Sequence, residues 1–302
     1  MNSLRTALVS TPSVGRATRN RRNYCAALAR LEAWESDAMS EFDWRSPTAY
    51  KKMQNAEAAD FAWEYLRRNS DYRQDYRNQQ NIGSIAAADP TFRQRWGFLF
   101  AADPDQAFDA QTIFWAPEVL PTVLRVGCGR AATYSRPYDV DIGELSGADL
   151  KRASDGWHAV LRLGAVTHRL WLRRLPAKSA PIILELPLDT DFDLQSRAAY
   201  RLWSAIGKRT LAESHSGLPL QRRQRLTLAI RALDGRIEGN SYRTIAEGLF
   251  GADRIPERSW KTHDLRNRTI RLVQTGLSLM RGGYRGLLRR RHGAIESTLP
   301  AE

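Results

Sequence analysis

Residues 241–276 read SYRTIAEGLFGADRIPERSWKTHDLRNRTIRLVQTG, and this stretch decides how the C-terminal third of the chain is organised. Ser241 precedes a periodic apolar segment that ends at Gly251, which predicts a short helix with a serine N-cap and a glycine stop. Ser259 is expected to cap a longer helix over 260–280. The inward stripe of this longer helix is Leu265, Thr269, Leu272, Val273 and Gly276. A short helix, a turn and a longer helix form the skeleton of a helix-turn-helix, here with a turn longer than usual.

A further amphipathic helix is expected just before this pair, over 222–233, and the Asp234-Gly235 dipeptide is expected to end it. At the other end, Gly282 and Gly283 predict a tight turn after the long helix, with Tyr284 packing back as a structural stop. A minority interpretation of the two glycines is a backbone nest that binds phosphate.

The positive charge of the chain is concentrated in this same region. The 302 residues carry a formal charge of +13, and residues 221–291 alone hold 17 basic and 6 acidic residues. All but one of those 17 are arginine, whose planar fork suits phosphates and guanine edges. An uneven distribution of this kind favours an anionic partner over a diffuse effect on solubility.

If the longer helix enters the major groove, the residues near its N-terminus meet base edges. The candidates for base reading are Ser259, Lys261, Thr262, His263, Arg266 and Asn267. The candidates for phosphate contacts are Arg243, Arg268, Arg271, Arg281, Arg285 and Arg289. The competing interpretation is a basic amphipathic helix that is merely solvated or lies on a membrane, and the order of caps and glycines disfavours it. A histidine at position 263 is more often structural than a base reader.

The remainder of the chain predicts an α+β fold that is predominantly α. We expect a flexible basic extension over 1–38 that contributes little to the fold. The native protein does not have to begin with this extension. The other expected regions are a helical domain over 39–100, a linker over 101–121, a small β-rich region over 122–192 and a helical domain over 193–302. The β-rich region contains a hairpin over 157–173 and a proline-flanked edge strand over 181–188. The aromatic residues of 39–100 predict a small helical core or, less favoured, a partner-binding surface.

Several classes of protein are disfavoured by composition. Cys25 and Cys128 match neither a disulfide framework nor a metal motif, so we expect no metal and no cofactor. The sequence has no apolar run of the ~20 residues that a membrane span requires, and a cytoplasmic protein is expected. None of the five histidines lies in a catalytic motif, so an enzyme is not expected. Two rival functions remain: a tyrosine recombinase using Tyr284, and a regulator that binds protein without touching DNA.

Two segments also resemble known families. SYRTIAEGLFG at 241–251, together with LRNRTIRLVQTG at 265–276 and RGGYRGLLRR at 281–290, resembles a proteobacterial family with a variant helix-turn-helix. EFDWRSPTAYKKMQNAEAADFAWEYLRRNSDYRQDY at 41–76 is similar to the transcriptional-regulator-like domain. Together they resemble FseA-type activators, which are encoded by integrative and conjugative elements.

This resemblance implies a sequence-specific activator that binds promoter DNA and works with RNA polymerase. Its target would be an excisionase gene, whose expression licenses excision and conjugative transfer of a mobile element. The resemblance also implies a small antiactivator protein as a partner. Such an antiactivator would lack the basic recognition face, whereas this chain keeps Lys261, Arg266, Arg268 and Arg271.

Overall fold

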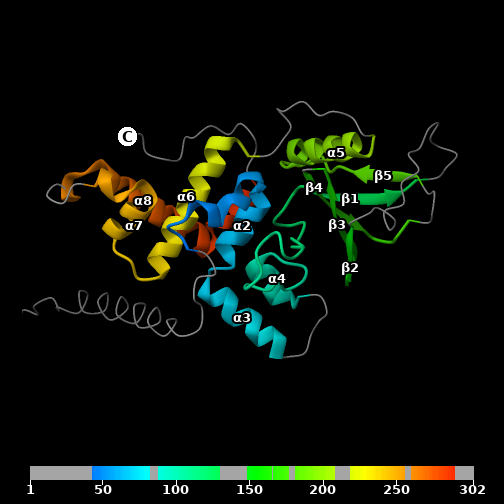
Figure 1. Ribbon diagram of the computed structural model, residues 1–302. Coiled ribbons are helices and arrows are strands. Elements are labelled where there is room, and N and C mark those ends of the chain that lie inside the picture. Colours follow the sequence, from blue (N-terminus) through cyan, green and yellow to red (C-terminus); the bar gives the residue numbers. More distant parts are fainter. Residues whose placement is uncertain are drawn as a thin grey trace, which may run out of the picture.

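The computed structural model describes residues 43–81, 88–129, 148–164, 166–176, 181–207, 218–255 and 260–289. Helices lie at both ends of this described chain, and a five-stranded sheet lies between them in sequence (Figure 1). The predicted class, α+β with helix predominating, is confirmed. The expectations for 1–38 and for Ser259 lie outside the described residues.

Four helices form the N-terminal region: the 3-10 helix η1 (Pro47–Asn55), α2 (Ala58–Leu66), α3 (Ser70–Asn81) and α4 (Pro90–Trp96). Helix α2 begins with a capping box, in which the Glu57 side chain accepts from the N3 backbone and Asp60 accepts from the Glu57 N–H. The expected aromatic core is present, because Phe61, Trp63 and Phe98 are fully buried. Aromatic rings here meet edge to face, with 5.7 Å between the centroids of Trp63 and Phe98.

The sheet has the strand order β2-β3-β4-β1-β5. Its strands are β1 (Val123–Cys128), β2 (Asp149–Ala153), β3 (Gly156–Leu163), β4 (Val166–Leu172) and β5 (Ile182–Glu185). Strands β1 and β4 are parallel and the other neighbours are antiparallel. The predicted hairpin and edge strand are confirmed as β3–β4 and β5. The sequence analysis missed β2, whose residues are mostly charged and exposed and therefore show no apolar alternation.

Helix α5 (Phe192–Ile206) covers one face of the sheet, where Figure 1 shows it beside β1 and β5. Its buried apolar residues Leu194, Ala198 and Leu202 recur every four residues and therefore lie on one face of the helix. Ala198 and Leu202 pack in one cluster with apolar residues of β1, β3 and β4.

Residues 101–121 contain no helix or strand, apart from a single bridge between Phe98 and Trp115. Their prolines and acidic residues predicted a linker. Ile113, Phe114, Trp115 and Leu120 are nevertheless buried. This loop therefore contributes to the interior, and its apolar run is the sequence signal that points there.

The C-terminal region holds the helices α6 (Leu220–Ile237), α7 (Tyr242–Phe250), α8 (Asp264–Ser278) and α9 (Tyr284–Leu288). The connections include the 3-10 turns η4 (Ala252–Arg254) and η5 (Trp260–Thr262) and the π turn η6 (Leu279–Gly283). The expected tight turn is present, because Gly282 has a φ of 126°. Tyr284 is 1% exposed and donates to the carbonyl oxygen of Trp96 at 3.0 Å, as expected for a structural stop.

Two predicted helix ends are wrong. Helix α6 does not end at Asp234-Gly235 but continues to Ile237, because Gly235 serves close packing rather than termination. Gly239, with a φ of 81°, lies just beyond the real end. Helix α8 begins at Asp264 rather than Trp260, since His263 provides the cap through Nδ1, which accepts from the Leu265 N–H at 3.2 Å.

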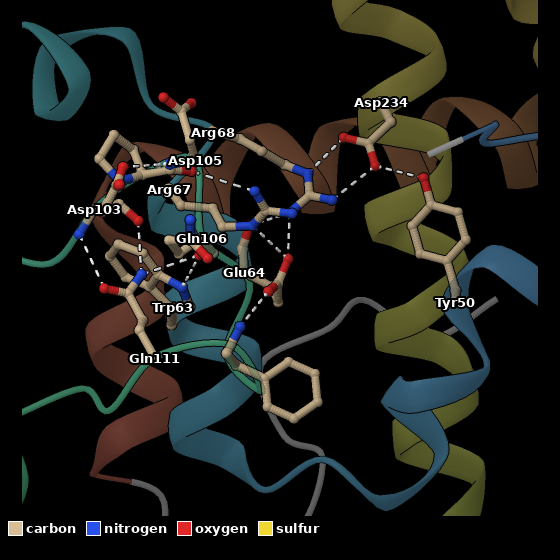
Figure 2. A network of polar contacts seen from close by, with 12 residues as sticks. Tyr50, Trp63, Glu64, Arg67, Arg68, Asp103, Asp105, Gln106, Gln111 and Asp234 are labelled. Carbon is tan, nitrogen blue, oxygen red and sulfur yellow. Dashed lines mark hydrogen bonds and ion pairs between the residues drawn. The ribbon is translucent and has the colours of Figure 1, made fainter. Parts of the chain in front are cut away.

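A buried polar network joins the N-terminal helices to α6 (Figure 2). Arg68 donates to both carboxylate oxygens of Asp234, at 2.5 and 2.9 Å, and to Glu64 at 2.8 Å. Tyr50 donates to Asp234 at 2.7 Å. Burial alone would raise the pKa of Glu64, but Arg67 and Arg68 hold it below its ordinary value. The apolar residues around this network form one cluster drawn from both ends of the chain.

We predict that Asp234→Ala lowers the free energy of unfolding by about 3 kcal/mol, because it removes the hydrogen bond that Tyr50 donates and two of the hydrogen bonds of buried Arg68. Urea denaturation would measure this change. The matched control is Asp253→Ala at an exposed position in η4, with an expected change within about 0.5 kcal/mol. Equal effects of the two substitutions would contradict a structural role for the network.

His168 on β4 makes the stability of the sheet depend on pH. Burial and the neighbouring Arg201 and Arg169 lower its pKa to about 4, and Nε2 has no hydrogen-bond partner among the described residues. Since the unfolded pKa is higher, the unfolded state binds a proton first as the pH falls. We therefore expect stability to decline from about pH 6.5 down through pH 4.

His168→Leu should flatten this part of the profile, because the leucine has no proton to bind. The measurement is the midpoint of urea unfolding at pH 7 and pH 4.5 for both proteins. Wild type should lose more stability than the variant over that interval. Parallel losses would show that His168 does not titrate in this way.

Candidate nucleic-acid interface

Helices α7 and α8 form the predicted helix-turn-helix-like pair. The Ser241 hydroxyl accepts from the Thr244 N–H at 3.1 Å, and Gly251 ends the first helix with a φ of 96°. The connection between the helices runs from residue 251 to 263. A helix pair with this long turn matches the prediction, although the second helix starts later than expected.

The predicted inward stripe of α8 is confirmed in full, since its five residues are all buried: Leu265, Thr269, Leu272, Val273 and Gly276. A Cβ on Gly276 would lie 2.8 Å from both the Ala229 carbonyl oxygen and the Leu233 Cβ of α6. Glycine at this position therefore allows the two helix backbones to approach closely. This packing fixes which side of α8 faces solvent.

The solvent side of α8 carries a line of polar residues. Asn267, Arg271, Gln274 and Ser278 are all exposed and follow one another at intervals of four, three and four residues. Such spacing places them along one face of a helix. Gln274 was missed in the sequence analysis, although its distance of seven residues from Asn267 was a sufficient signal. We call these four residues the outer line.

The predicted base readers divide according to exposure. Lys261 and Thr262 are exposed in η5. His263 is half-buried and occupied as the cap of α8. Arg266 is half-buried and lies seven residues before the fully buried Val273, so it projects from the flank of α8 rather than from the outer line.

The predicted phosphate contacts divide in the same manner. The Arg268 guanidinium lies 4.8 Å from the centre of the Phe250 ring, which braces an exposed cation against α7. Arg243 forms an ion pair with Glu247 at 2.9 Å. Arg271 and Arg281 are exposed, and neither guanidinium group has a hydrogen bond or ion pair with the part of the chain that the structure describes.

Two other arginines bind the protein itself. Arg285 donates to the carbonyl oxygens of Gln94 and Arg95, both at 2.7 Å. Arg289 donates to the carbonyl oxygen of Glu118. These guanidinium groups hold α9 against α4 and the loop that follows it.

Trp44 connects the N-terminal region to the helix-turn-helix-like pair. Its indole is fully buried and donates to Glu238 at 2.6 Å. A Cβ on Gly235 of α6 would lie 3.1 Å from the ring, and a Cβ on Gly248 of α7 would lie 2.5 Å from it. The indole therefore occupies a close-packed slot between the two helices, in which Gly248 has no room for a Cβ and Gly235 has little.

Arg231 of α6 adds hydrogen bonds to the backbone on either side of this connection. Its guanidinium donates to the carbonyl oxygens of Trp44 at 2.8 Å and Arg45 at 2.7 Å. Burial lowers the pKa of Arg231. Arg231 is one of the 17 basic residues of 221–291, but it is a buried structural group.

Two segments of the chain match models of transcription factor domain families. Residues 185–289 match the family model described as "T6SS, Transcription factor, DNA binding domain". Residues 43–101 match the model of the proteobacterial transcriptional regulator-like domain. No curated protein matches the chain. One segment of the chain is thus similar to a transcriptional regulator-like domain and another is similar to a RovC-like DNA-binding domain.

The structure also bears on the rival functions. The Tyr284 hydroxyl is buried and bound to the Trp96 carbonyl oxygen, and burial raises its pKa, so it is not placed as a nucleophile. Within the described ranges, no group of three His, Cys, Asp or Glu residues is arranged to hold a metal. Among the helices described, none is long and apolar enough to cross a membrane.

We predict that Gly248→Ala lowers the free energy of unfolding by about 1–3 kcal/mol, because the new methyl group would collide with the rigid indole of Trp44. Gly286→Ala is the matched control, since nothing lies within 4 Å of its Cβ position in α9. The control should be neutral or stabilising by up to about 1 kcal/mol. Thermal unfolding of both variants tests this, and a neutral Gly248→Ala would refute the slot.

Proposed function

We propose that this protein is a sequence-specific transcriptional activator that reads DNA through the outer line of α8. The observation that carries the proposal is the combination of an exposed asparagine, arginine and glutamine on one face of the second helix in a helix-turn-helix-like pair. In such pairs the second helix lies in the major groove. The matches to transcription factor domains support the same conclusion.

Asn267, Arg271 and Gln274 are the base readers that we propose. Arginine pairs in bidentate fashion with guanine, and asparagine and glutamine pair with adenine. We therefore assign Arg271 to base reading rather than to phosphate contacts. Arg266 becomes a flanking residue because of its position beside Val273. Each good bidentate pair discriminates against the wrong base by about 1–3 kcal/mol.

Phosphate contacts are proposed for the cations around the outer line. Lys261 lies before α8, Arg268 lies on the side facing α7, and Arg281 lies beyond the C-terminal end of the helix. These groups would fix orientation and affinity without reading sequence. Arg243 is available only if its ion pair with Glu247 opens, and Arg285 and Arg289 only if their bonds to carbonyl oxygens break.

The target proposed from the family resemblance is a gene that controls excision and transfer of a mobile element. RNA polymerase and a small antiactivator are the proposed protein partners. The family description with its type VI secretion label suggests a second class of target, a secretion gene cluster. Genome-wide mapping of binding sites for the full chain separates the two. Peaks at neither class of gene would remove both targets.

We predict that Arg271→Ala weakens binding to the selected DNA site by about 5- to 150-fold and weakens binding to random duplexes much less. The site would first be selected from a pool of random duplexes with the wild-type protein. Gel shifts with a salt titration then give both affinities, and wild-type binding should weaken as salt rises.

The matched control is Arg77→Ala, an exposed arginine on α3, which should leave both affinities unchanged. Arg289→Ala should also have little effect, because its guanidinium is bound to Glu118. Equal losses on selected and random DNA in Arg271→Ala would show that the base-reading residues are misassigned. Failure to select any site would favour a regulator that binds only protein.

A further inference from the structure

A hollow of about 440 Å³ lies at the edge of the sheet, away from the outer line of α8 in sequence and in fold. It is formed by the turn between β2 and β3 and by the residues that follow β4. Its lining consists of Arg152, Ala153, Ser154, Asp155, Gly156, Trp157, Arg173, Arg174 and Leu175. Three arginines from two separate segments of chain therefore share one concave surface.

Gly156 is the residue that brings these two segments together. It has a φ of 135°, and a Cβ there would lie 2.4 Å from the Leu172 carbonyl oxygen and 3.1 Å from the Arg173 Cα. Only glycine allows the β2–β3 turn to pack directly on the end of β4. The Trp171 indole also donates to the Asp155 carbonyl oxygen at 3.0 Å and braces the turn from the other side. The hollow is thus a preformed feature of the sheet.

The charges in the hollow are unbalanced. Asp155 is the one acidic residue among its described lining residues, and its two oxygens already bind His158 at 2.9 Å and Arg93 at 3.2 Å. Arg152, Arg173 and Arg174 are exposed, and none of their guanidinium groups has a hydrogen bond or ion pair with the described residues, although that of Arg152 lies over the Trp157 ring. Three cations close together repel one another. An anion bound among them would relieve this repulsion.

The shape and the walls narrow the choice of anion. A volume of 440 Å³ falls within the range of about 300–1,000 Å³ typical of small-molecule sites. Arginine forks bind phosphate oxygens in bidentate fashion. The lining also includes a half-buried Trp157, over whose ring the Arg152 guanidinium lies at 5.9 Å, and a Leu175 that is 41% exposed. A base could pack against these side chains while its phosphates meet the arginines.

We propose that this hollow binds a nucleoside phosphate, as an effector site separate from the DNA-binding surface. The proposal does not depend on which helix reads DNA. The bound nucleotide would join the β2–β3 turn to the residues after β4.

The test is calorimetric titration of the full chain with ATP and with GTP, and with adenosine and pyrophosphate as partial probes. We expect at least one nucleotide to bind, adenosine to show no binding, and pyrophosphate to bind more weakly than the nucleotide. The double variant Arg173→Ala/Arg174→Ala should lose about tenfold or more in nucleotide affinity. Arg271→Ala on α8 is the matched control and should change affinity by less than about twofold.

Thermal unfolding would confirm that the double variant is folded, and Arg152→Ala provides a second variant if it is not. The proposal is overturned if neither nucleotide binds, or if the folded arginine variants keep wild-type affinity. It is also overturned if Arg271→Ala loses as much affinity, because the nucleotide would then bind the DNA surface. If the double variant instead loses duplex DNA affinity, the hollow is part of the DNA interface and the proposal fails.

Discussion

The rest of the structure depends on the ion pair between Asp234 and Arg68. The indole of Trp44 packs against Gly235, the next residue of α6. Asp234 is buried at 7% exposure, and its carboxylate accepts from Arg68 and Tyr50 of the N-terminal helices. A buried charge is costly unless it is paired and hydrogen-bonded, so α6 requires these helices in place. The Trp44 indole then sets the distance between α6 and α7. The orientation of the α7–α8 helix pair is therefore determined from outside that pair.

This dependence explains why the two segments that match family models pack together instead of forming separate domains. The large apolar cluster contains Phe61 and Trp63 of α2 together with Leu233 of α6 and Tyr284 of α9. Such a core cannot be divided between residues 43–101 and the C-terminal helices without exposing apolar surface on both parts. The sheet and α5 keep a separate apolar cluster, which is consistent with an attached layer.

Local signals in the sequence were enough for the helix-turn-helix-like pair and its buried stripe. Ser241, Gly251 and the five inward residues of α8 act through neighbours three or four residues away, so periodicity and capping rules reach them. Gly235 shows where such rules fail. Next to an aspartate at the end of an apolar run it has the pattern of a helix stop, but its function is to admit an indole about 190 residues away in sequence. No local rule contains that information.

The charge pattern located the basic region but could not rank its members. Arg231, Arg285 and Arg289 look equivalent to Arg271 in sequence, yet each of the first three donates to backbone carbonyl oxygens of distant segments. Guanidinium groups that already donate to carbonyl oxygens contribute less to phosphate binding, because those hydrogen bonds must break first. Arg271 differs because the packing of Gly276 against α6 turns the opposite side of α8 outward. A glycine five residues away thus decides that this arginine faces solvent, and only tertiary packing reveals it.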